Sequence, residues 1–169
     1  IAFGASRAVY LDNPAAESAL SEALRLGTES ELWPQLVELL TVAVERAPEN
    51  LDRRFDLAAA QMRLKLWSLA VEQLQVVTAA RPEDRPAAHN MAMALTAASR
   101  WHEARAAWDK VVALGTDGDT LARRAEVLMD LELWNEAALD LSAARELDPS
   151  SVETLLNLAT ALEHKTQTL

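Results

Sequence analysis

The chain has 169 residues, of which 50% are hydrophobic and 25% are charged, so it can bury a substantial core as one domain or one array. Its formal net charge of −10 disfavours binding to nucleic acid and to anionic lipid surfaces. It has no cysteine, which excludes disulfides and thiolate metal sites and leaves cytoplasm and periplasm equally allowed.

The composition favours helices. Ala, Leu and Glu are abundant, and only four glycines and six prolines interrupt the chain. No run of about 18 apolar residues occurs, so we expect no membrane insertion. Frequent Ala, together with more Arg than Lys, favours a GC-rich bacterial source.

Two residue types mark an internal repeat. Tryptophans recur at intervals of 34, 34 and 33 residues, at Trp33, Trp67, Trp101 and Trp134. Prolines keep the same interval, at Pro14, Pro48, Pro82 and, two periods later, Pro149. The missing proline falls at 114–117, where Leu-Gly-Thr-Asp breaks the helix by other means and one residue has been lost.

Between these markers the apolar residues recur at steps of three and four, which is the helical period. Each period therefore holds two helices with a tight turn between them. We expect helices, in chain order, at 2–12, 16–27, 33–46, 51–64, 67–80, 85–98, 101–114, 119–131, 134–147 and 151–164.

Small residues stand where the two helices of one period would cross. The pairs are Ala58 with Ala70, Ala92 with Ala104, and Ala125 with Ala137. A unit of 34 residues with small residues at this crossing, an aromatic opening its second helix and a closing proline resembles the tetratricopeptide repeat. The units are 17–50, 51–84, 85–117 and 118–151, with half repeats at 1–14 and 152–164.

The resemblance implies an all-α fold, a right-handed superhelical solenoid of antiparallel helix pairs that forms a single array over 1–169. The first unit departs from the pattern. Leu24 and Leu36 replace the crossing alanines, and Pro34 follows Trp33. We therefore expect its two helices to lie further apart or to be shifted in register.

No pattern in the sequence indicates catalysis. His89, His102 and His164 have no neighbour at metal-ligand spacing, and no glycine-rich loop could hold a phosphate. The carboxylates are scattered over helical surfaces. We therefore expect no enzymatic activity, no metal and no cofactor, and we interpret the spaced tryptophans as packing residues.

In this family the first helices of the repeats line the concave face, so a stripe along each of them predicts the binding site. The predicted peptide-binding residues are Phe55, Ala59, Met62, Arg63, His89, Asn90, Met93, Arg123, Glu126 and Met129. Methionines with a phenylalanine make an adaptable apolar surface, and acidic residues lie beside it. The expected partner is another protein or peptide, apolar on one face and carrying some basic residues.

The family includes members that clamp a terminal carboxylate through Lys, Asn and Arg. Asn90, Arg123 and Asn157 fit such a clamp, but Phe55 and Ala59 do not, so we do not extend that activity to this chain.

A second function class stays open, namely a structural spacer or a self-assembling segment of a larger protein. The half repeats at 1–14 and 152–164 would leave apolar residues uncovered, among them Phe3, Val9, Tyr10, Leu156 and Leu162. We therefore expect weak homo-association through the chain ends and a parent chain that continues beyond both of them.

Overall fold

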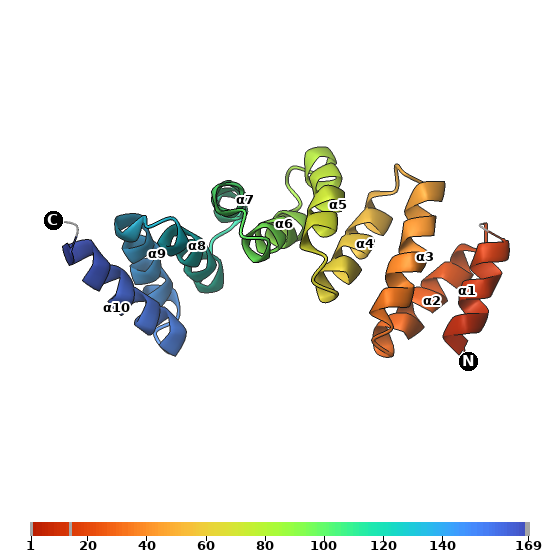
Figure 1. Ribbon diagram of the computed structural model, residues 1–169, viewed down its shortest axis with the longest axis horizontal. Helices are drawn as coiled ribbons and strands as arrows, with labels where there is room; N and C mark the ends of the chain where they lie inside the picture. The colour runs from red at the N-terminus through yellow and green to blue at the C-terminus, as the bar shows by residue number, and fades with distance from the viewer. Residues whose placement is uncertain (1, 14, 168–169) are drawn as a thin grey trace. The chain divides into compact units, whose positions relative to one another are not determined.

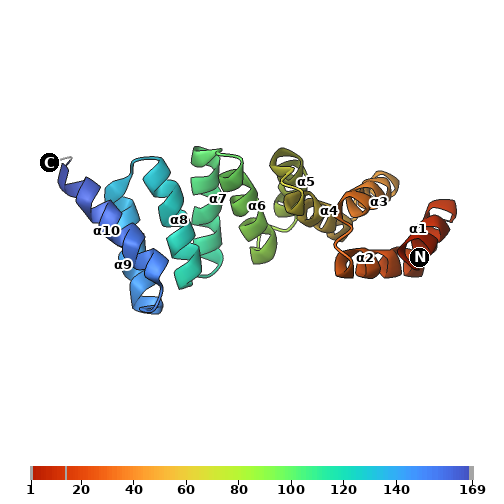
Figure 2. The same cartoon turned by 60° about the horizontal axis from the view of Figure 1, so that its bottom comes forward.

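The computed structural model describes residues 2–13 and 15–167, and this part of the chain is all α-helical without a strand. The helices are α1 (Ala2–Asp12), α2 (Glu17–Glu29), α3 (Trp33–Arg46), α4 (Leu51–Arg63), α5 (Trp67–Ala80), α6 (Arg85–Ala97), α7 (Trp101–Leu114), α8 (Gly118–Asp130), α9 (Trp134–Leu147) and α10 (Val152–Gln167) (Figures 1 and 2). All ten helices predicted from the repeat are confirmed, with ends that differ by a few residues.

The helices group into two compact units, Ile1–Ala80 with α1 to α5 and Arg81–Leu169 with α6 to α10. Within each unit, consecutive helices pack against each other as antiparallel neighbours (Figure 2). A single superhelical array over the whole chain stays a prediction.

The tight turn inside each repeat has the same backbone conformation four times. One residue with positive φ follows each first helix: Glu31 at 54°, Lys65 at 59°, Ser99 at 56° and Glu132 at 59°. The next residue then donates its N–H five residues back, as from Leu66 to the Gln61 carbonyl at 2.9 Å. This is the Schellman end of a helix, which is usually made by glycine. The second helix begins directly after it, so the turn fixes where each spaced tryptophan lies.

The start of each first helix from the second repeat onward is also periodic. A side-chain oxygen accepts a hydrogen bond from the backbone N–H three residues later at Asn50 (3.1 Å), Asp84 (3.0 Å), Asp117 (2.8 Å) and Ser151 (3.2 Å). Such N-caps satisfy a donor that the helix itself leaves unpaired. The caps recur with the repeat, and they hold the connections between repeats as the Schellman turns hold the connections inside them.

The alanines predicted at the helix crossings are all fully buried. Ala58, Ala70, Ala92, Ala104, Ala125 and Ala137 are each 0% exposed. In the second unit, Ala125 and Ala137 belong to one core cluster with Leu128 and Leu141. A methyl group at the crossing lets two helix axes approach closely, so these positions are confirmed as the packing sites of the repeat.

The first repeat is the exception that its sequence predicts. Helices α2 and α3 make far fewer contacts with each other than the helices of the later pairs do. Their close approach occurs at Gly27, where an added Cβ would stand 2.6 Å from Leu36 Cδ2. The fewer contacts, and a close approach at Gly27 rather than at Leu24, agree with the expectation that this pair lies further apart or is shifted in register.

The tryptophans that open the second helices are only partly buried. Polar side chains from other helices cover two of them. The Arg63 guanidinium lies 4.9 Å from the Trp33 ring centroid, and the His164 ring stacks on Trp134 at 4.3 Å. The tryptophan that fills a core is Trp108, which is 0% exposed. Its indole N–H donates to Thr96 Oγ1 at 3.0 Å.

This difference predicts which tryptophan stabilises the fold most. Trp108→Ala should lower the free energy of unfolding by about 3–5 kcal/mol, as other large-to-small core substitutions do. Trp101→Ala should cost clearly less, because its ring is partly exposed. Urea denaturation of the two variants measures both changes, and equal losses would contradict this assignment of the core.

The positive-φ turns predict a stabilising substitution. Lys65→Gly should raise the free energy of unfolding by about 1 kcal/mol, because the left-handed conformation costs an L-residue about that much and costs glycine little. Lys65→Ala is the matched control and should change little, since alanine has the same Cβ as lysine. Thermal denaturation of the three proteins tests this, and a glycine variant no more stable than the alanine variant would count against it.

Candidate functional site

The first unit contains a pocket of about 620 Å³ between α2, α3 and α4. It opens beside the widely separated first pair of helices. Its lining is Leu24, Arg25, Thr28, Glu29, Trp33, Leu36, Leu40, Asp56, Ala59, Ala60 and Arg63. The aliphatic and aromatic members provide an apolar surface, and the charged members provide polar groups that can orient a ligand.

The cations of this pocket are held by neighbours. Arg25 forms ion pairs with Glu22 at 2.7 Å and Glu29 at 2.6 Å, and Arg63 lies over the Trp33 ring. The surroundings of the Asp56 carboxyl, by contrast, disfavour its charged form. Burial and then the charge of Asp52 raise the pKa of Asp56 above its ordinary value. A cation brought to this carboxylate would favour its charged form and so oppose both effects.

The second unit has two pockets on the exposed side of α8, and Glu126 lines both. The larger, of about 310 Å³, is formed by Glu126, Met129, Asp130, Trp134 and Asn157. The other, of about 280 Å³, is formed by Gly118, Asp119, Ala122, Arg123, Glu126, Ala144, Asp148, Ser151, Glu153 and Thr154. We call the two together the α8 groove, and α10 contributes Glu153 and Asn157 to it.

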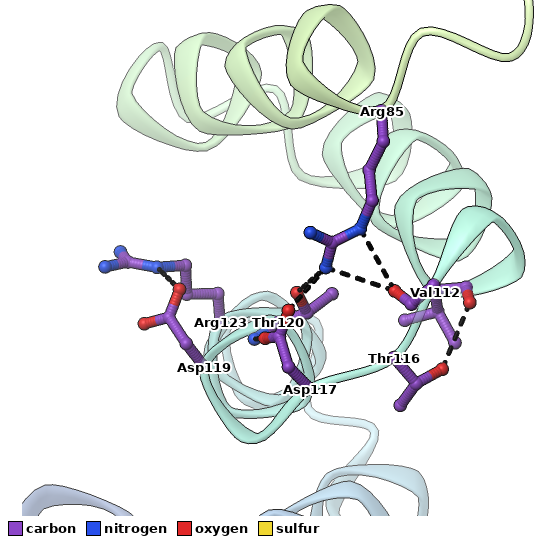
Figure 3. A network of polar contacts seen from close by, with 8 residues as sticks. Arg85, Val112, Thr116, Asp117, Asp119, Thr120 and Arg123 are labelled. Atoms are coloured by element: carbon purple, nitrogen blue, oxygen red, sulfur yellow. Dashed lines mark hydrogen bonds and ion pairs between the residues drawn. The ribbon is translucent and has the colours of Figure 1, made fainter.

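Negative charge dominates the α8 groove. Burial raises the pKa of Glu126, and Glu153, Asp119 and Asp130 raise it further against the opposing charge of Arg123. Arg123 is itself engaged, because its Nε donates to Asp119 Oδ2 at 2.8 Å (Figure 3). The groove therefore has carboxylates in excess of its one arginine and favours a ligand with positive charge.

Arg85 positions the start of α8. Its guanidinium donates to the Gly115 carbonyl at 3.1 Å and to Thr120 Oγ1 at 3.0 Å, and it forms an ion pair with Asp117, the N-cap of α8 (Figure 3). This network spans the connection that is one residue shorter than the others. The sequence marked the break at 114–117, but no spacing pointed to Arg85 as the residue that holds it.

The structure groups about half of the predicted site residues. Ala59 and Arg63 line the pocket of the first unit, and Arg123, Glu126 and Met129 line the α8 groove. Met93 on α6 joins the second group, because Arg123 Nη1 lies 3.5 Å from its sulfur.

The other predicted residues have different surroundings. Phe55 and Met62 are partly exposed on α4 but do not belong to the lining of the pocket beside it. Asn90 is partly buried. His89 packs edge-on against the Trp108 ring at 5.1 Å, and burial, with Arg123 next, lowers its pKa. His89 therefore supports the core as well as the surface. A continuous groove from Phe55 and Met62 to Met93 and Met129 involves both units and stays a prediction.

Sequence reasoning missed several lining residues. Leu24 and Leu36 stood out only as departures from the crossing alanines, Leu40 was not singled out, and Trp134 was interpreted as a packing residue. The departure of Leu24 and Leu36 from alanine was the available signal, because a wider helix crossing leaves space beside it. The expectation that Tyr10 is uncovered was wrong, because its ring is 1% exposed and packs with Leu20 and Leu39.

Residues 2–13 and 15–167 contain neither a candidate metal site nor a candidate membrane-spanning helix. No group of three or more His, Cys, Asp or Glu side chains there could hold a metal ion. None of the helices in the same residues is long and apolar enough to cross a membrane.

Among known proteins, no family model matches the sequence, and no curated protein matches it either. Solved structures do match. A crystal structure of MamA protein superimposes with a TM-score of 0.81 at 15% identity, covering 96% of this chain and 84% of that one. YrrB, described as a TPR protein with an unusual peptide-binding site, gives 0.80 at 18% identity, covering 90% and 79%. A thermophilic TPR protein of Thermus thermophilus gives 0.63 at 19% identity, covering 95% and 88%. At these identities the likeness is one of fold.

The raised pKa of Glu126 predicts how stability depends on pH. Its protonated form is favoured in the folded state, so stability from this group is present below the ordinary glutamate pKa of about 4.3 and is lost as pH rises through the higher folded pKa. Glu126→Gln should therefore raise the melting temperature at pH 7 but not at pH 3. The exposed Glu146→Gln on α9 is the control, and equal effects at both pH values would contradict the prediction.

Proposed function

We propose that this chain, whose fold is that of the tetratricopeptide repeat proteins, is a protein-interaction module that binds a peptide segment of a partner. The observation that carries the proposal is the α8 groove. Two of the predicted site residues, Glu126 and Met129, line open space there together with an excess of carboxylates.

The chemistry of the groove favours a basic segment. A Lys or Arg side chain near Glu126 would relieve the repulsion from Glu153 and Asp130 that raises the pKa of Glu126. Met129 and Trp134 add an apolar wall along which the stem of such a side chain can lie. Charge and apolar contact thus favour the same kind of ligand.

The pocket of the first unit favours an apolar side chain. Leu24, Leu36 and Leu40 contribute its aliphatic surface, and Trp33 contributes a ring held by Arg63. A bulky apolar side chain of the partner fits such a surface, and a neighbouring basic residue would meet Asp56. The proposed ligand is therefore a segment, helical or extended, that carries both large apolar and basic residues.

The solved structures support an interaction role by analogy of fold. YrrB is described as having a peptide-binding site, and we propose the same class of function for this chain without transferring its residues. We assign no reaction to the chain. The alternative role, a structural spacer or self-assembling segment of a larger protein, stays a prediction from the sequence.

Peptide display tests the proposed function. A random peptide library selected against the chain should enrich sequences with large apolar and basic residues. Glu126→Lys should raise the dissociation constants of the selected peptides about tenfold or more, which corresponds to about 1.4 kcal/mol of binding free energy. Glu146→Lys makes the same charge change on an exposed part of α9 and should have little effect. Isothermal titration measures both.

The pocket of the first unit has its own test with the same peptides. Ala59→Trp fills the pocket and should weaken the binding of peptides that place an apolar side chain there. Ala79→Trp, on the exposed side of α5, is the control and should leave this binding unchanged. Selected peptides that are not enriched in basic residues would contradict the proposed site. Binding that neither Glu126→Lys nor Ala59→Trp changes would contradict it as well.

A further inference from the structure

The pocket between α2, α3 and α4 has a balanced set of charges, unlike the α8 groove. Its lining includes two arginines, Arg25 and Arg63, and two carboxylates, Glu29 and Asp56. Apart from Thr28, the other lining residues are apolar. A basic ligand alone would therefore gain less here than in the α8 groove, and the placement of the four charges determines which segment the pocket favours.

Two of these charges neutralise each other on α2. Arg25 Nη1 donates to Glu29 Oε1 at 2.6 Å, and Arg25 Nη2 donates to Glu22 Oε1 at 2.7 Å. The hydrogen bond to Glu22 and then the one to Glu29 raise the pKa of Arg25 above its ordinary value. The three side chains form a closed network, so they present little uncompensated charge to a ligand.

The other two charges, both on α4, lack such partners. Within residues 2–13 and 15–167, neither Asp56 nor Arg63 forms an ion pair or a side-chain hydrogen bond. The Arg63 guanidinium lies 4.9 Å from the Trp33 ring centroid, but a ring does not replace a carboxylate as the acceptor for its N–H donors. Burial and the charge of Asp52 raise the pKa of Asp56. Each group therefore favours a ligand group of the opposite sign.

Asp56 and Arg63 lie on either side of the apolar part of the pocket. They are the first and the last α4 residues in its lining, and two helical turns place them on one face about 10 Å apart along the axis. Ala59 and Ala60 lie between them, and their small side chains leave room in front of α3. The order along α4 is therefore carboxylate, apolar surface, guanidinium.

We propose that this pocket recognises a partner segment in which a large apolar residue lies between a basic residue and an acidic residue. The basic group pairs with Asp56, the apolar side chain enters the pocket, and the acidic group pairs with Arg63. The two charges of the segment then lie about 10 Å apart, which seven residues of a helix or three of an extended chain span. The inference rests on the proposed function, to which it adds an acidic residue and an order of charges.

The two charges give the recognition a direction. A segment that enters the other way round would bring its basic group to Arg63 and its acidic group to Asp56, and both contacts would be repulsive. Apolar contact thus provides affinity, and the charges fix how the segment runs along α4. An acidic residue disfavours binding in the α8 groove, where carboxylates are in excess, so the two candidate sites select different segments.

A double-mutant cycle tests the pairing with Arg63. The probes are the library peptides whose binding Ala59→Trp weakens, because that substitution fills this pocket. We expect them to contain both an acidic and a basic residue. Arg63→Gln in the full chain, or Gln in place of the peptide's acidic residue, should each raise the dissociation constant about fivefold, and both together should raise it no further. Isothermal titration measures all four combinations.

The second cycle combines Asp56→Asn with Gln in place of the peptide's basic residue, and we expect the same coupling. Lys65→Gln and Glu72→Gln remove charges at exposed sites outside the pocket lining, and they are the controls that should leave binding unchanged. Arg63→Lys keeps the charge and should retain most of the affinity. Circular dichroism checks that each variant remains helical.

The outcomes separate this inference from the proposed function. Pocket-dependent peptides without an acidic residue, or additive effects of Arg63→Gln and the peptide substitution, would overturn the inference and leave the proposed function standing. So would a set of selected peptides that all bind equally well to Ala59→Trp but depend on Glu126. A library that yields no binding peptide would reject the proposed function and the inference together.

Discussion

The close crossing of two helices at a pair of alanines is the contact on which the rest of this structure depends. Where both alanines are present, as at Ala92 and Ala104, the helices pack tightly and the residues around them are buried. Where leucines replace them, at Leu24 and Leu36, the helices separate and a pocket opens. One local rule thus accounts for both the core and a candidate binding pocket.

Hydrogen bonds at the helix ends position the helices for these crossings. The Schellman turn inside a repeat and the N-cap between repeats fix the ends of successive helices, so little freedom is left in the connections. At the one connection that is shorter, Arg85 binds Gly115, Thr120 and the capping Asp117. This network fixes the start of α8, the helix that carries the candidate groove.

The two candidate sites use different physical forces. The α8 groove has an unfavourable concentration of negative charge, which a basic ligand would relieve, and such binding is sensitive to pH and salt. The pocket of the first unit has an aliphatic surface from Leu24, Leu36 and Leu40, so the binding of an apolar side chain there depends on removing aliphatic surface from water, and this part of the binding responds little to charge screening.

The sequence by itself determined the repeat, the helices and the alanine crossings, because these depend on contacts between residues within one period. The 34-residue spacing of Trp33, Trp67 and Trp101 was enough to place every helix to within a few residues. The sequence also indicated the irregular first repeat from Leu24 and Leu36. Only the tertiary structure decided which surfaces are hollow and which rings are covered. Trp108, which lies outside the repeat of tryptophans, fills a core, and the His89 ring packs edge-on against it. Burial of this kind depends on neighbours from other helices. The shift in the Glu126 pKa likewise arises from Glu153, brought close by α10 and far away in the chain, and no local pattern can report such proximity.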